Sequence, residues 1–228
     1  MAPGSPDLLM CHTCGTQFDL PSDQPPSGCR ICDDPRQWIP PSGQKWTSLG
    51  AEQSAGHVNN LAPLTININS NSALDAPTPT SSDLSVTTST IPDAFTVSTT
   101  PQLGIGERAV LITTPHGNVL WDLVAYLDDA TVNAINAHGK LKAIVISHPH
   151  YYTTHLDWAE AFECPVYIAA EDEEWCSRKD EAKRRRFISQ ETEEILPGVT
   201  AVKVGGHFPG SLILHWNNIL FLADSIVT

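Results

Sequence analysis

Apolar runs of four to six residues recur through the second half of the chain, separated by turn residues and short helical stretches. Runs of this length, rich in Val and Ile, are typical of buried strands. The predicted strands are residues 109–113, 119–122, 143–146, 165–169, 199–204, 212–216 and 219–223. Residues 128–139 start with acids, keep helical spacing and stop at a glycine, and residues 154–162 also favour a helix. This alternation predicts an α/β (α+β) domain over residues 103–228.

Residues 49–102 differ in composition from the rest of the chain. No Lys or Arg occurs between Lys45 and Arg108, and Ser and Thr are dense from Thr65 onward. Polar segments of this kind bury too little apolar surface to offset their chain entropy. We therefore predict a Ser/Thr-rich linker or insertion, partly disordered, with short strands at residues 64–68 and 95–97.

Four of the six cysteines form two Cys-x-x-Cys pairs near the N-terminus. Cys11 and Cys14 make the first pair, Cys29 and Cys32 the second, and 14 residues separate the pairs. Two such turns supply the four-thiolate set that tetrahedral Zn²⁺ prefers. We predict a four-cysteine zinc-knuckle module over residues 8–48, which needs the metal for much of its folding energy. Two disulfides, free thiols or a rubredoxin-type iron site are the alternatives.

Charge narrows the possible partners. The chain has 13 Lys and Arg against 26 Asp and Glu, a net charge of −13. An acidic protein is a poor candidate for binding nucleic acid or an anionic membrane. The sequence has no apolar run of transmembrane length and no signal-peptide pattern. Closely spaced cysteine pairs also suit a reducing compartment, so we expect a cytoplasmic protein.

Histidines and an acid follow three of the predicted strands. His148 and His150 stand two apart just beyond one strand, and Pro149 between them disfavours a helix there. His207 lies in a glycine-rich turn after a second strand, and Asp224 ends a third. Neutral imidazoles that point to one spot are the commonest protein ligands of transition metals. The alternative is that the His pair only caps a strand end.

The order His-x-His, then Gly-His-x-Pro-Gly, then apolar-x-Asp, each at a strand end, resembles the metallo-β-lactamase superfamily. Within it, the chain looks most similar to a group of MBL-fold metallo-hydrolases that share Ser-His-Pro-His-Tyr-Tyr and carry an N-terminal Cys-x-x-Cys module. The resemblance covers residues 103–228. It implies an αββα sandwich preceded by the small knuckle module.

The resemblance also implies a set of metal ligands. The superfamily's first motif is His-x-His-x-Asp-His, and Tyr152 and Thr153 stand where its Asp and last His should be. The first metal site of the superfamily keeps its ligands, whereas the second loses them. The ligands implied here for one zinc ion are His148, His150 and His207, with Asp224 beside them at the bridging position.

Other residues have roles only by this resemblance. His155 and Asp157 would restore a second metal site if the local loop differs from that of the superfamily. Asp224 or Asp157 would shuttle a proton, and the Tyr152 phenol would face the water or a substrate oxygen. Asp122 stands where members commonly carry an Asp that supports the metal site, and its alternative role is a helix N-cap.

Only four residues follow Asp224, where the superfamily continues with more strands, a helix and a final His ligand. We therefore expect a C-terminally truncated version of the fold, with an exposed sheet edge.

Three functions remain open at this point. The first is a zinc-dependent metallo-hydrolase that acts on a small-molecule ester, thioester, amide or phosphoester. The second is a non-catalytic metal-binding or interaction protein. The third is a rubredoxin-like electron-transfer protein, because the four-cysteine set also holds iron.

Overall fold

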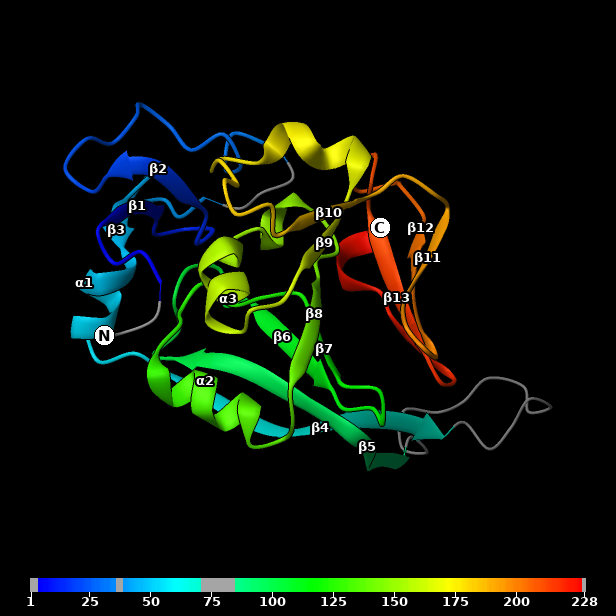
Figure 1. The fold of residues 1–228 in the computed structure, drawn as a ribbon. Coiled ribbons are helices and arrows are strands. Elements are labelled where there is room, and N and C mark those ends of the chain that lie inside the picture. Colours follow the sequence, from blue (N-terminus) through cyan, green and yellow to red (C-terminus); the bar gives the residue numbers. More distant parts are fainter. Residues whose placement is uncertain (1–3, 36–38, 71–84, 227–228) are drawn as a thin grey trace, which may run out of the picture.

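A seven-stranded mixed sheet forms the centre of the computed structural model, which describes residues 4–35, 39–70 and 85–226 (Figure 1). Its strands are β4 (Val58–Ser70), β5 (Ser85–Thr100), β6 (Arg108–Ile112), β7 (Asn118–Trp121), β8 (Leu141–Val145), β9 (Val166–Ala169) and β10 (Arg185–Ile188). The strand order is β10-β9-β8-β7-β6-β5-β4. β7 to β10 run parallel, and β6, β5 and β4 continue the sheet with antiparallel pairing. The carboxyl ends of the parallel strands therefore meet at one edge.

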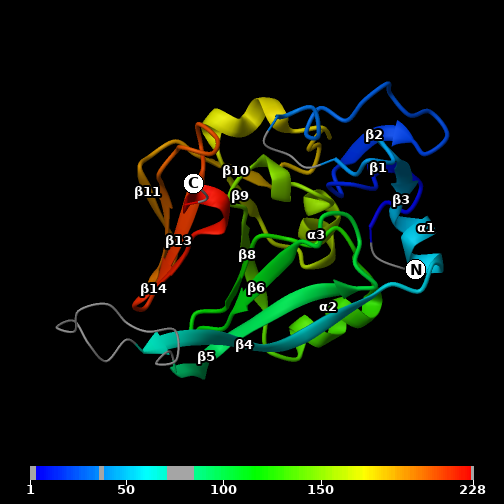
Figure 2. The ribbon, with the colours of Figure 1, turned by 180° about the vertical axis from the view of Figure 1, so that it is seen from behind.

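A four-stranded antiparallel sheet packs on one face of the large sheet (Figures 1 and 2). Its strands, in spatial order, are β11 (Thr192–Leu196), β12 (Val199–Lys203), β13 (Leu212–Trp216) and β14 (Ile219–Phe221). Apolar side chains of both sheets, such as Val145 of β8 and Leu214 of β13, form one buried cluster between them. This burial is what holds the two sheets face to face.

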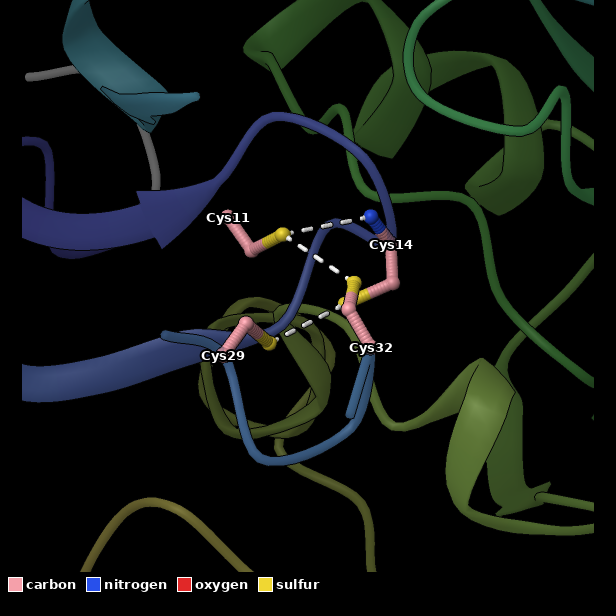
Figure 3. Close-up of side chains that lie close together, drawn as sticks. All are labelled: Cys11, Cys14, Cys29 and Cys32. Atoms are coloured by element: carbon pink, nitrogen blue, oxygen red, sulfur yellow. Dashed lines mark hydrogen bonds between the residues drawn. The ribbon is translucent and has the colours of Figure 1, made fainter. Parts of the chain in front are cut away.

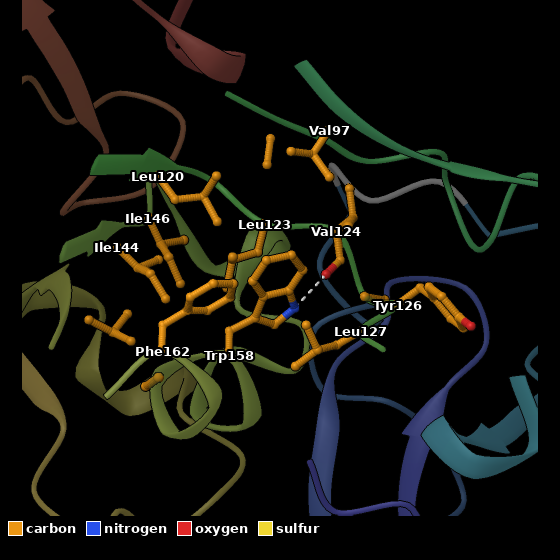
Figure 4. Close-up of a cluster of buried hydrophobic side chains, with 14 of the residues drawn as sticks. Val97, Leu120, Leu123, Val124, Tyr126, Leu127, Ile144, Ile146, Trp158 and Phe162 are labelled. Atoms are coloured by element: carbon orange, nitrogen blue, oxygen red, sulfur yellow. Dashed lines mark hydrogen bonds between the residues drawn. The ribbon is translucent and has the colours of Figure 1, made fainter. Parts of the chain in front are cut away.

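Two helices, α2 (Asp129–Asn136) and α3 (His155–Ala161), cover the other face of the large sheet. The Asp128 carboxylate caps α2 by accepting a hydrogen bond of 2.7 Å from the Thr131 amide. A second buried cluster lies between these helices and the sheet, with Trp158 of α3 at its centre (Figure 4). In the described residues, the helices α2 and α3 form one layer, the large sheet the next, and the small sheet the last. The predicted α+β class is confirmed.

The predicted linker over residues 49–102 differs from the structure. Residues 58–70 and 85–100 are the long strands β4 and β5, and β5 pairs with β6, which joins this hairpin to the large sheet. Ala94 and Val97 of β5 are buried, while most Ser and Thr of this hairpin face outward. The polar sequences of β4 and β5 form strands because they pair with other strands, and not because of their own composition. The part of the prediction that concerns residues 71–84 lies outside the described residues.

The cysteine-rich module is a three-stranded antiparallel sheet that continues into a short helix. Its elements are β1 (Leu8–Cys11), β2 (Gln17–Pro21), β3 (Trp46–Ser48) and α1 (Leu49–Ser54). The module contacts the rest of the molecule through backbone hydrogen bonds, from the Ile105 amide to the Thr13 carbonyl (2.9 Å) and from the Gln17 amide to the Thr153 carbonyl (3.2 Å). It is therefore docked on the sheet domain.

Candidate metal centres

Three loops bring the predicted histidine centre together. β8 ends at Val145, and His148 follows in extended backbone before the single 3₁₀ turn η1 (Pro149–Tyr151), which carries His150. His207 comes from the turn between β12 and β13, and Asp224 comes from the 3₁₀ turn η3 (Ala223–Ile226) after β14. Pro149 at the start of η1 fixes the turn that separates the two imidazoles.

Four candidate ligand atoms converge at this place. The Oδ2 of Asp224 lies 3.4 Å from the Nε2 of His148 and 4.0 Å from the Nε2 of His207. The Nε2 of His207 lies 3.3 Å from the Nδ1 of His150. One ligand atom of each of these four residues lies within 4.8 Å of the others. Such a group of three imidazoles and one carboxylate has the donor types and the spacing of a mononuclear zinc site.

The electrostatics of the group favour a neutral His150 and an ionised Asp224. Burial, with the neighbouring His148 and His207, lowers the pKa of His150 to about 3. The hydrogen bond with His148 holds the pKa of Asp224 below its ordinary value. The Nε2 of His150 is buried and has no hydrogen-bond partner. An orphaned buried nitrogen is costly unless a ligand satisfies it, so the residues fit a bound cation.

A buried chain of polar groups supports His148 from behind. The Ser147 hydroxyl lies 2.8 Å from the Nδ1 of His148, and the Ser147 amide donates to the Oδ1 of Asp122 at 2.8 Å. Asp122 directly follows β7 and is 2% exposed, and burial raises the pKa of its carboxyl to about 7. It does not cap a helix. Asp122 and Ser147 fix the orientation of the imidazole, as supporting partners of metal-binding histidines do.

The structure places the other predicted site residues elsewhere. The Tyr152 hydroxyl is buried and donates to the Asp172 carbonyl at 3.2 Å. The Asp157 carboxylate forms a buried ion pair with Arg178 at 2.8 Å. Neither residue belongs to the group of converging ligand atoms. The roles predicted for them are therefore not supported: Tyr152 packs in the core, and Asp157 neutralises an arginine.

His155 also lies away from the converging ligands. Its Nδ1 lies 2.6 Å from the Tyr152 carbonyl, and its Nε2 accepts a hydrogen bond of 2.8 Å from the Nε of Arg185. Both ring nitrogens are thus engaged in the core. The described residues therefore supply one candidate metal centre at this edge of the sheet, and no replacement for the second site.

Sequence reasoning missed two aromatic neighbours of the centre. The Tyr151 ring lies 5.3 Å from the His148 ring, and the fully buried Phe208 ring stacks on His148 at 5.6 Å. Tyr151 and Asp122 also line a cleft of about 630 Å³ between the two sheets. The apolar walls of this cleft come from β4 to β7 and β14 and include Leu64, Ile91, Val110, Trp121 and Phe221. No local pattern marks these residues, because only the packing of the sheets brings them together.

The four N-terminal cysteines form the second candidate centre (Figure 3). The Sγ atoms of Cys11 and Cys32 lie 3.6 Å apart, and those of Cys14 and Cys29 lie 3.7 Å apart. All six cysteines are free, so the disulfide alternative is wrong. Zn–S bonds of about 2.3 Å in a tetrahedron place the sulfurs about 3.8 Å apart, close to these distances.

The surroundings of the sulfurs suit thiolates. The amides of Thr13 and Cys14 and the side-chain amide of Gln44 donate to the Cys11 sulfur at 3.0 to 3.5 Å. Hydrogen bonds with Cys14 and the other cysteines hold the pKa of the Cys11 thiol well below its usual range. Burial raises the pKa of Cys14, so without a cation the cluster cannot be fully ionised. A divalent cation resolves this conflict by stabilising all four thiolates.

Gly15 closes the first knuckle in the left-handed region, with φ of +67°. A Cβ at this position would lie 2.3 Å from the Cβ of Ala125. The knuckle therefore approaches the sheet domain more closely than any residue with a side chain could.

Comparison with known proteins gives a curated relative and several solved structures. No family model matches the chain. The chain is 37% identical over 208 residues to the uncharacterized protein YmaE of Bacillus subtilis (strain 168). The match covers 91% of this chain and 66% of the relative, slightly less than two thirds of its length.

Solved structures of metallo-β-lactamases are among those that match part of the chain. VMB-1 is 14% identical with a TM-score of 0.43, over 54% of this chain and 61% of that protein. SMB-1 is 18% identical with the same TM-score, over 54% and 55%. MEM-A1, a subclass B3 enzyme from a soil metagenome library, is 20% identical with a TM-score of 0.42, over 54% of each chain.

No helix in the described parts of the chain is long and apolar enough to cross a membrane. Along 91% of its length the chain is similar to YmaE, and metallo-β-lactamases are among the solved structures that it resembles.

Proposed function

We propose that this protein is a zinc-dependent metallo-hydrolase with one catalytic zinc and one structural zinc. The convergence of His148, His150, His207 and Asp224 carries the proposal, because no structural role explains three buried or half-buried imidazoles that face one carboxylate. The four-cysteine cluster would hold the structural ion. The substrate would be a small molecule with an ester, thioester, amide or phosphoester bond.

A zinc ion at the histidine centre would supply Lewis acidity, which activates water near neutral pH. The chain's own groups prepare the place for it. The Ser147 hydroxyl lies 2.8 Å from the Nδ1 of His148, so a proton on Nδ1 would be bound by Ser147 and the Nε2 lone pair would hold the ion. Asp224 is half-buried and ionised, so its Oδ2 can receive a proton during hydrolysis. The cleft beside Tyr151 can hold an apolar substrate group against the centre.

We propose a cytoplasmic location, because closely spaced cysteine pairs that could hold a metal suit a reducing compartment.

Metal content and hydrolysis test the proposal together. Purified wild type should contain about two zinc ions per chain, and His207→Ala about one, because one imidazole ligand is lost. His116→Ala, in an exposed turn, is the matched control and should keep two. Chromogenic esters, thioesters and phosphodiesters should be hydrolysed by wild type and the control, and not by His207→Ala.

Three results would separate the alternatives. If wild type and His207→Ala both contain one zinc ion, the histidine centre does not bind zinc. Two zinc ions without hydrolysis of any of these substrate classes would favour a non-catalytic binding protein. Visible iron–thiolate absorption in the purified protein would favour electron transfer, since a zinc site is colourless.

A further inference from the structure

The four-cysteine cluster and the histidine centre are connected by one short element, the 3₁₀ segment η2 (Ala170–Trp175). At its end, Trp175 packs against the apolar cluster around the four cysteines and also against the main core under α3. The guanidinium of Arg30, inside the second Cys-x-x-Cys pair, lies 5.6 Å from the centre of the Trp175 ring. The indole is thus held on one side by the second knuckle.

On its other side, Trp175 contacts the histidine centre through one residue. Its ring meets the Phe208 ring edge-on, with centroids 5.3 Å apart. Phe208 is fully buried, stacks on His148 at 5.6 Å and meets His150 at 4.9 Å. Phe208 also follows His207 directly in the chain. Its ring therefore contacts all three imidazoles.

A second contact joins η2 to the same turn. The amide of Gly210 donates to the Oδ1 of Asp172 at 3.0 Å. A Cβ on Gly210 would lie 2.5 Å from the Cβ of Ala169, so the turn lies directly against η2. The glycine-rich backbone between Gly205 and Gly210 is intrinsically permissive and needs such external contacts to hold His207 in place.

We propose that Trp175 is a positioning residue through which the metal-binding state of the four-cysteine module sets the affinity of the histidine centre for its own metal. The inference rests on the proposed function. The module has a small apolar core. We therefore expect it to depend on its metal for folding. When the metal is lost, Arg30 and its neighbours leave the Trp175 ring, Phe208 loses its edge contact, and the imidazoles lose their fixed geometry.

Cobalt titration tests this proposal, because cobalt bound by four thiolates and cobalt bound by imidazoles have separable absorption bands. Trp175→Leu should keep the thiolate bands and bind cobalt at the histidine centre about 10–100-fold more weakly, the range typical of lost supporting contacts. Trp175→Phe keeps an aromatic ring and should restore most of the affinity. Cys29→Ser should weaken the histidine centre by a similar factor.

Trp46→Leu is the matched control. Trp46 packs on another aromatic side chain of the module, Phe18, with ring centroids 5.5 Å apart. The control should leave cobalt affinity at the histidine centre unchanged, with circular dichroism showing that all variants are folded. Wild-type affinity in Trp175→Leu, or in Cys29→Ser with its thiolate bands lost, would overturn the proposal. Wild type that binds cobalt only at the cysteines would instead refute the proposed function, and this inference with it.

Discussion

The docked module changes the protonation of one buried carboxyl group, that of Glu107. Glu107 precedes β6, is 5% exposed, and its Oε1 is buried without a hydrogen-bond partner. Burial, which outweighs the hydrogen bonds from the backbone of Glu107 and Ala125, raises the pKa of this carboxyl to about 8. A Cβ at Gly15 would be 3.4 Å from Oε1, so the first knuckle covers the group. Glu107 is therefore neutral in the folded protein near pH 7.

This raised pKa predicts a stability that falls as pH rises. Below about pH 4.5 the carboxyl is protonated in both folded and unfolded chains, and it imposes no penalty. Between about pH 4.5 and 8 the unfolded chain releases the proton while the folded protein keeps it, so the free energy of unfolding decreases. Glu107→Gln should remove this decrease and be more stable than wild type at pH 8, by on the order of 3 kcal/mol.

Urea unfolding of both proteins at pH 5 and pH 8 measures the effect. Glu160→Gln, at an exposed site on α3, removes a carboxylate without burial and should leave the pH dependence of wild type unchanged. Parallel pH profiles for wild type and Glu107→Gln would show that Glu107 is ionised in the folded protein.

At the scale of elements, the largest side chain that packs α3 into the core is Trp158. Trp158 is fully buried, its indole N–H donates to the Val124 carbonyl at 3.1 Å, and it stacks on Phe162 at 5.8 Å (Figure 4). Because η1 with His150 leads directly into α3, this packing also fixes the entry to the histidine centre. The helix is short, so tertiary packing rather than intrinsic propensity stabilises it.

Removing this side chain should loosen the element. Trp158→Ala creates a large cavity and leaves a buried carbonyl unpaired, so it should lower the free energy of unfolding by about 3–5 kcal/mol. Leu220→Ala on β14, where the side chain is 52% exposed, should change stability by less than about 0.5 kcal/mol. Chemical denaturation measures both, and an equal loss in the two variants would contradict the role of Trp158.

At the scale of the whole molecule, the N-terminal module is part of the domain surface. Besides the backbone contacts, Arg178 donates to the Gln17 side chain at 2.5 Å and pairs with Asp157 at 2.8 Å, and Asp157 accepts from the Ser5 amide at 3.0 Å. The ion pair itself lies within the sheet domain, and each of its two partners bonds to the N-terminal segment, Arg178 to Gln17 and Asp157 to Ser5. Separating the two parts would remove these hydrogen bonds from a largely buried charge pair. Loss of the module's metal should therefore also destabilise neighbouring residues outside the module.

We predict a graded response to Cys14→Ser. Residues up to about 46 should become protease-sensitive, since we expect the module to fold only with its metal. Amide hydrogen exchange should also speed up in residues 148–155 and in η2, which contact the module, while β6 to β9 stay protected. Mass mapping after proteolysis and exchange measures both. Uniform protection along the chain would show that the cysteines do not need a metal to fold.

The sequence by itself determined the features that local pattern controls. Short apolar runs predicted β6 to β9 and β12 to β14, because side-chain periodicity and β-branched content act within a few residues. The strands β10 and β11 are rich in charged residues and were not predicted. The spacing Cys-x-x-Cys predicted the cluster of Cys11, Cys14, Cys29 and Cys32, and the order of the strand-end motifs predicted that His148, His150, His207 and Asp224 converge.

Only the tertiary structure decided the rest, because those features depend on pairing and burial between distant residues. β4 and β5 are polar in sequence and become strands through pairing with each other and with β6. Tyr152 and Asp157 are near the motif in sequence, yet core packing and Arg178 engage them elsewhere. The contact of Trp175 with both the cysteine cluster and Phe208 joins segments with no common pattern, since free energy of packing depends on three-dimensional neighbours rather than on sequence order.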